Sequence, residues 1–256
     1  MGLGARMLLQ SLLGMDRTRR PADAGAREAL FFVHIPKCAG SSFRQVLKRW
    51  FGRAAVFLDT HDPRELERAV ERLGQPPRAI AGHMPFGLHA GLPVRPCYVS
   101  LVRHPLDRFV SVYGHARRSP DDPMHEAARS LDIEAFYDFT LQDPPAHGRT
   151  VGIQCHFLSR GRTFEEARSV IDRSYALLAP IERYEEFVEG CAERFGCDAL
   201  IPPPRNVSHD KPLGQDARAR LLERIEADHI DDLRLHRYVS RTFDARRASL
   251  SFALHT

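Results

Sequence analysis

Three basic side chains are the residues of this chain best suited to chemistry, and each ends a short apolar run. Lys37 follows the run 31–35, while His83 and Arg103 end two later runs of the same kind. Lysine and arginine favour an anionic ligand, and the ordinary pKa of histidine lies close to neutral pH. Each residue also has an ordinary structural interpretation, with Lys37 as a surface lysine of a turn, His83 as a hydrogen-bonded turn histidine and Arg103 paired with Asp107.

The loop that carries Lys37 lies between a predicted strand and a predicted helix. Pro36 and Gly40 interrupt the apolar run, and Ser41 or Ser42 is expected to cap a helix whose apolar residues recur at helical spacing. The amide groups and the positive end of the dipole at a helix start form an anion site. The loop is not a Walker A sequence, because G-x-x-x-x-G-K-[ST] is absent and Lys37 precedes the glycine.

Alternating strands and helices position these residues. Strands are predicted at 31–35, 55–58, 78–84, 97–102 and 175–181. Helices are predicted from the loop serines, at 62–74, from Pro105, at 131–141, 151–158 and 164–171, up to Phe195, and twice after Gln215. This order predicts an α/β fold with a central, mostly parallel sheet flanked by helices and a helical C-terminal half. Ligands bind at the carboxyl ends of such strands, where Lys37, His83 and Arg103 should meet.

Length and composition indicate one globular domain. The 256 residues are 43% hydrophobic, and we expect a weakly ordered or amphipathic arm over 1–29 and a single domain over 30–256. A net charge of +4 with intermixed signs argues against a nucleic-acid partner. The five cysteines have neither disulfide nor zinc-site spacing, so a reducing, cytoplasmic location is expected. The apolar stretch MLLQSLLGM is too short to span a membrane, and contact with a membrane surface through the arm is the alternative.

Three sequence segments together resemble a known family. They are HIPKCAGSSF, AGHMPFG and SLVRHPLDRFVSVYGH, in that order. They resemble the 5′-phosphosulfate loop, the catalytic histidine turn and the 3′-phosphate element of sulfotransferases that use 3′-phosphoadenosine 5′-phosphosulfate (PAPS). The branch is the one that contains the heparan sulfate 2-O-sulfotransferases and bacterial relatives. Cys38 and Ser41 depart from it, since many relatives have threonine there.

The resemblance implies a P-loop NTPase-like sulfotransferase fold and a role for each matching residue. Lys37 would neutralise the leaving oxygen of PAPS, and His83 would be the general base. Arg103 and Ser111 would hold the 3′-phosphate. The loop residues expected to bind the donor are Lys37, Cys38, Ala39, Gly40, Ser41, Ser42 and Phe43. A weaker match suggests that Asn206, Ser208 and Lys211 close over the nucleotide.

The implied reaction moves the sulfuryl group of PAPS to an acceptor hydroxyl on a carbohydrate or glycoconjugate and releases 3′-phosphoadenosine 5′-phosphate (PAP). No metal is required. A nucleotide-dependent kinase with a related core and a non-catalytic nucleotide-binding protein are the alternatives. The sequence indicates neither the residues of the acceptor site nor the oligomeric state, because acceptor residues lie on variable loops and helices without a readable motif.

Overall fold

The computed structural model describes residues 27–199 and 214–252. Within them, five strands form one parallel sheet in the order β2-β3-β1-β4-β5. The strands are β1 Glu28–Val33, β2 Ala55–Phe57, β3 Ala79–Gly82, β4 Arg95–Val102 and β5 Tyr175–Pro180. The α/β class and the parallel sheet predicted from the sequence are therefore confirmed.

Both faces of the sheet are buried, which explains why its strands are apolar without alternation. Phe31 pairs with Tyr98 in register and faces the side on which Tyr98 contacts Tyr175. The next residue, Phe32, points to the opposite face, where its ring contacts Phe43 and Phe187. The two faces are thus covered by different helices.

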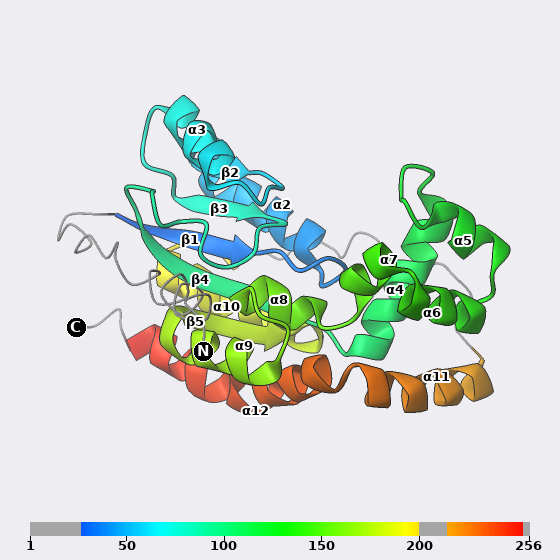
Figure 1. The fold of residues 1–256 in the computed structure, drawn as a ribbon. Coiled ribbons are helices and arrows are strands. Elements are labelled where there is room, and N and C mark those ends of the chain that lie inside the picture. The colour runs from blue at the N-terminus through cyan, green and yellow to red at the C-terminus, as the bar shows by residue number, and fades with distance from the viewer. Residues whose placement is uncertain (1–26, 200–213, 253–256) are drawn as a thin grey trace, which may run out of the picture.

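Helices surround the sheet in two groups (Figure 1). The first group packs around the sheet and consists of α2 Gly40–Phe51, α3 Pro63–Leu73, α8 Ile153–Ser159, α9 Phe164–Ser174, α10 Tyr184–Phe195 and α12 Ile230–Phe252. The second group lies beyond the carboxyl ends of the strands and consists of α4 Pro105–Arg118, α5 His125–Ser130, α6 Ile133–Gln142, α7 Pro144–Thr150 and α11 Gln215–Asp228. Short 3₁₀ turns occupy Gly52–Ala54 and Ile181–Arg183.

The second group of helices has a hydrophobic core of its own. Phe109 of α4 contacts the rings of Phe136 and Tyr137 on α6, and all three side chains are buried. Leu221 and Ile225 of α11 complete this cluster. This second group is therefore a packing unit of its own, whereas the other helices of the predicted helical half pack around the sheet.

Most predicted elements are present, with differences at their ends. The helix predicted at 164–171 is α9, and Thr163 and Glu166 form a capping box at its start. β1 starts at Glu28 instead of 31, because Ala29 is buried and Glu28 forms an ion pair with Arg194 at 2.9 Å. The strand therefore includes two residues assigned to the N-terminal arm. The helices α5 and α7 were not predicted, and both are short.

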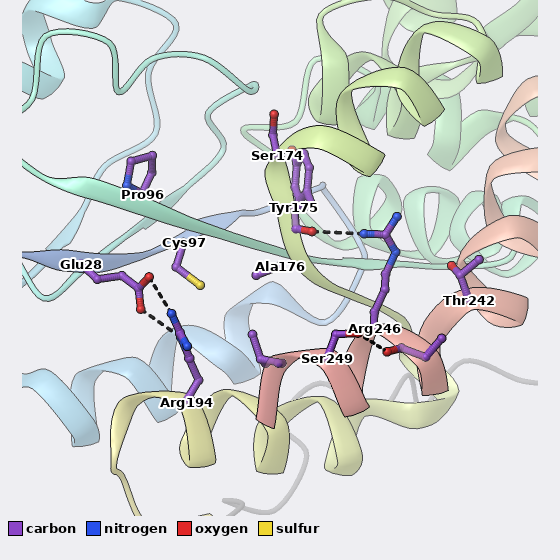
Figure 2. Close-up of a pocket in the computed structure, with 12 residues that line it drawn as sticks. Glu28, Pro96, Cys97, Ser174, Tyr175, Ala176, Arg194, Thr242, Arg246 and Ser249 are labelled. Carbon is purple, nitrogen blue, oxygen red and sulfur yellow. Dashed lines mark hydrogen bonds and ion pairs between the residues drawn. The ribbon is translucent and has the colours of Figure 1, made fainter. Parts of the chain in front are cut away.

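A cavity of about 560 Å³ lies at the amino ends of the strands, opposite the predicted site (Figure 2). Its charged residues are held by hydrogen bonds within the chain: Arg194 donates to Glu28, and Arg246 donates to the backbone carbonyl of Tyr175 at 3.1 Å. We therefore assign this cavity no part in the predicted chemistry. Among the described residues, no helix has the length and apolar character required to cross a membrane.

Candidate active site

The three predicted site residues follow three neighbouring strands at the centre of the sheet. β1 lies between β3 and β4, so the chain segments that follow these strands leave the sheet side by side. Lys37 follows β1, His83 follows β3 and Arg103 follows β4. Neighbouring strands are roughly 4.8 Å apart, so the topology alone brings the three residues to one edge.

The loop between β1 and α2 has an unusual backbone. Lys37 and Ala39 have φ angles of 69° and 57°, in the left-handed region that side chains other than glycine rarely adopt. The N–H of Cys38 donates to the Ile35 carbonyl at 3.2 Å, which tightens the turn. Alternation with left-handed residues turns successive amides towards one side and forms an anion-binding nest. The strained backbone is the local feature expected of an anion loop.

The start of α2 differs from the sequence prediction. The helix begins at Gly40 with Ala39 as the N-cap residue, and no described side chain caps it. Ser41 and Ser42 therefore lie inside the first turn, where neither can be the cap. Ser42 and Phe43 donate their N–H groups to the Ala39 carbonyl, at 3.1 and 3.3 Å.

Two of the predicted donor-binding side chains are turned away from solvent. Phe43 is fully buried between Phe32 and Phe187 in the sheet core. Cys38 is buried too, its thiol donates to Gln154 Oε1 at 3.6 Å, and burial raises its pKa to about 12. These side chains stabilise the loop from inside the protein, so the predicted contact of Cys38 and Phe43 with the donor stays a prediction about their backbone groups.

The imidazole of His34 packs against Gly40, the first residue of α2. A Cβ atom at Gly40 would lie 1.8 Å from Cδ2 of His34, so only glycine fits there. Burial lowers the pKa of His34 to about 2, and the positive charges nearby act in the same direction. Because the ring is buried and lies near several cations, its neutral form is the stable one.

His83 is held by its backbone and by its ring. Its Nδ1–H donates to the His34 carbonyl at 2.8 Å, and the two imidazole rings stack with centroids 4.0 Å apart. A carbonyl oxygen can only accept, so the proton of the neutral ring is on Nδ1 and the lone pair is on Nε2. The His83 N–H donates to Asp59 Oδ1 at 2.8 Å. The half-buried ring thus presents a basic nitrogen in a fixed orientation.

Arg103 lies against the lysine loop. Its Nη1 donates to the Lys37 carbonyl at 3.2 Å, while its buried Nε has no hydrogen-bond partner among the described residues. Burial lowers the pKa of Lys37, and the positive charges of Arg118 and Arg103 lower it further. Like charges held this close favour an anion between them.

Gln154, which the sequence did not suggest, joins the two cationic segments. Its amide accepts from the Arg103 N–H and donates to the Arg103 carbonyl, each at 2.9 Å, and it also accepts from the Cys38 thiol. The buried carboxylate of Asp232 accepts from the Gln154 and Cys155 N–H groups at 3.4 and 3.1 Å. A single buried amide therefore fixes the distance between the loop after β1 and the turn after β4.

The helix α4 brings further positive charge towards Lys37. Burial lowers the pKa of His115, and the positive charge of the nearby Lys37 lowers it further. The nearby Arg118 in turn lowers the pKa of Lys37. Ser111 precedes these residues by four and seven positions, which puts all three on one face of the helix. Ser111 is half-buried and shares its helix face with His115 and Arg118.

These features define a site for an anionic ligand with a basic imidazole beside it, at the carboxyl edge of a parallel sheet. Cationic groups and loop amides can bind a phosphate or sulfate group, and Nε2 of His83 can take a proton from a neighbouring hydroxyl. Among the described residues, no group of histidine, cysteine and carboxylate side chains could hold a metal ion. Asn206, Ser208 and Lys211, which were predicted to close over the nucleotide, lie outside the described residues.

The profile of the sulfotransferase family matches residues 24–194, more than half of the chain, so the chain belongs to the sulfotransferase family. The match includes Lys37, His83, Arg103 and Ser111. A solved structure similar to the chain is that of a sulfotransferase from Alicyclobacillus acidocaldarius, with 16% sequence identity, a TM-score of 0.49, and coverage of 83% of this chain and 96% of that chain. None of the curated proteins compared with the chain matches it significantly.

Proposed function

We propose that this sulfotransferase moves the sulfuryl group of PAPS to an acceptor hydroxyl, with His83 as the general base. The observation that carries the proposal is the orientation of His83: its Nδ1–H is bound to the His34 carbonyl at 2.8 Å, which leaves Nε2 to accept a proton. Family membership supports sulfuryl transfer, and the residues around the loop after β1 supply the positive charge that the donor needs.

The cationic residues have distinct roles in this proposal. Bound PAPS supplies an electrophilic sulfur and a phosphate leaving group. The amides of the loop and the hydroxyl group of Ser42 hold the 5′-phosphate at the start of α2. The buried Nε of Arg103, together with Ser111, holds the 3′-phosphate. The ammonium group of Lys37 neutralises the bridging oxygen, which takes the electron pair of the breaking sulfur–oxygen bond.

His83 acts at the other end of the transferred group. Its Nε2 removes the hydroxyl proton while the acceptor oxygen forms its bond to sulfur in line with the leaving oxygen. The products are a sulfate ester, PAP and protonated His83. We propose a carbohydrate or glycoconjugate as the acceptor, on the basis of the resemblance described above.

Incubation of the protein with ³⁵S-labelled PAPS and a panel of glycans, lipids and small phenols tests the proposal. We expect one class of hydroxyl compound to become labelled and PAP to be released in equal amount. Tight PAP binding without any labelled product would favour the non-catalytic alternative. Turnover of ATP with magnesium would favour the kinase.

Two variants separate the proposed roles. His83→Ala should lower kcat on the order of a hundredfold or more with PAP affinity nearly unchanged, whereas His147→Ala, an exposed histidine on α7, should change neither. Arg103→Ala should weaken PAP binding on the order of tenfold or more, because its contact is present before the reaction. Arg95→Ala, at the opposite end of the same strand, is its control. An Arg103→Ala protein with unchanged PAP affinity would exclude the 3′-phosphate role.

A further inference from the structure

We infer that Asp59 is a positioning residue for His83. The inference rests on the proposed role of His83 as the base. Asp59 follows β2, and its Oδ1 accepts a hydrogen bond of 2.8 Å from the backbone N–H of His83. It therefore acts on the segment that carries the imidazole and makes no contact with the reacting atoms.

The segments around Asp59 and His83 are packed closely. A Cβ atom at Gly82 would lie 1.7 Å from the Leu58 carbonyl oxygen and 3.0 Å from Asp59 Oδ1. The residue before His83 therefore has no room for a side chain, and the chain after β2 lies directly against it. A shift of Asp59 would be transmitted to the His83 backbone through this contact.

Asp59 is itself held in place from two directions. Leu58 donates its N–H to the Ala81 carbonyl at 3.2 Å, which extends the pairing of β2 with β3 up to Asp59. On the other side, the buried Thr60 donates to Glu65 Oε2 at 2.5 Å and accepts from the Asp62 N–H at 3.0 Å. Hydrogen bonds therefore hold the chain on both sides of Asp59, and a residue that orients a catalytic side chain must be held in this way.

The two restraints on His83 act on different parts of the residue. The His34 carbonyl fixes the ring through Nδ1, and Asp59 fixes the backbone. Loss of the backbone restraint would leave the ring bonded to His34 while the segment that carries it moves. Arg44 Nη1, 3.7 Å from Asp59 Oδ1, joins this carboxylate to α2, the helix that follows the donor loop. Displacement of a catalytic group by roughly 1 Å can cost on the order of a hundredfold in rate.

The test compares Asp59→Ala and Asp59→Asn with Asp62→Ala, which removes a carboxylate three residues away at the start of α3. We expect Asp59→Ala to lower kcat about tenfold with little change in the KM for PAPS, because the side chain is half exposed and water replaces part of its contact. Asp59→Asn retains an acceptor oxygen and should stay within about threefold of the parent, as should Asp62→Ala.

A spectroscopic measurement distinguishes positioning from a general loss of structure. In ¹H–¹⁵N spectra of the full chain without donor, Asp59→Ala should shift the His83 amide proton upfield and speed its exchange with solvent. Asp59→Asn and Asp62→Ala should leave both nearly unchanged. An unchanged His83 amide, or an unchanged kcat with a shifted amide, in Asp59→Ala would overturn the inference.

The same measurements separate this inference from the proposed function. If His83→Ala retains full sulfuryl transfer, the base assignment fails whatever the Asp59 variants do. If His83→Ala is inactive and Asp59→Ala is as active as the parent, only the positioning role fails.

Discussion

The helices α2 and α3 occupy equivalent positions in the fold but start in opposite ways. Each follows a parallel strand and begins at the carboxyl edge of the sheet. At α3 the carboxylate of Asp62 accepts from the Arg64 N–H, and Glu65 is in the first turn. At α2 the N-cap residue is Ala39, no described side chain caps the helix, and its first turn has no acidic residue.

This difference separates a structural helix start from one that can receive a ligand. The free N–H groups at a helix start attract negative charge. The protein supplies that charge itself at α3, and the two aspartates Asp132 and Asp143 do the same for α6 and α7. At α2 it supplies positive charge instead, through Lys37. In the proposed function, the 5′-phosphate of PAPS is the anion that pairs with this helix start.

Removal of the positive charge at α2 is the strongest test of this comparison. We expect Lys37→Ala to lower kcat/KM for sulfuryl transfer about a hundredfold to a thousandfold, because the charge on the leaving oxygen would be left without its cation. Arg64→Ala, which removes a cation from the first turn of α3, should change the rate less than twofold. Steady-state kinetics with the acceptor identified by labelling would measure both. Equal losses in the two variants would show that the two helix starts do not differ in function.

Lowering the pH should lower the free energy of unfolding, because the His34 imidazole beside α2 stays neutral in the folded protein. The pKa of His34 is about 2 in the folded protein, against an ordinary value of 6.5, because the ring is buried. Above pH 6.5 the folded and unfolded chains are both neutral at this residue. As the pH falls below 6.5 the unfolded chain binds a proton that the folded chain does not, so His34 lowers the free energy of unfolding by about 1.4 kcal/mol per pH unit.

His34→Leu should remove this part of the acid sensitivity. Between pH 6.5 and 5.0 the parent should lose about 2 kcal/mol more stability than the variant, as measured by urea unfolding at each pH. The buried His229, whose pKa is lowered to about 3 by burial, is present in both proteins and cancels in the difference. Parallel pH dependences in the two proteins would mean that His34 takes up a proton in the folded state.

A negative charge in the first turn of α2 should make its start resemble that of α3, which carries its own acidic residue. Ser42 is the third residue of α2, as Glu65 is the third residue of α3. We expect Ser42→Glu to weaken PAP binding about tenfold through repulsion of the bound anion, with stability unchanged or raised by about 0.5 kcal/mol. Ser42→Gln, of the same size without the charge, should stay within about threefold in calorimetric titration. Equal PAP affinities for the two variants would place the anion elsewhere.

The strand ends could be predicted from the sequence because they depend on short stretches of chain. Apolar runs placed Lys37, His83 and Arg103 at the ends of three strands, and the order of the elements placed the strands in a parallel sheet. The start of α2 was predicted wrongly, since Ser41 and Ser42 are good capping residues in isolation. The first residue of the helix, Gly40, packs against the His34 ring, and a contact of this kind exists only in the folded loop.

The residues that support the site could not be predicted because their contacts join distant parts of the chain. Asp59 is 24 residues from His83, and Gln154 is 51 residues from Arg103. Asp232 lies 78 residues beyond Gln154, on α12. No local pattern marks such a residue, since a lone aspartate or glutamine is ordinary surface composition. Only the folded chain brings these side chains under the loops that they hold.

The smallest effect we predict concerns the start of α3, which is capped by Asp62. Asp62→Ala should lower the free energy of unfolding by about 1 kcal/mol, because an N–H of the first turn of α3 loses its acceptor, and Asp62→Asn should cost only a few tenths because asparagine also caps. Urea unfolding measures both, and PAP titration should give the parent affinity in each. Weaker PAP binding in Asp62→Ala would mean that the start of α3 also contributes to the ligand site, and the distinction between the two helices would then be one of degree.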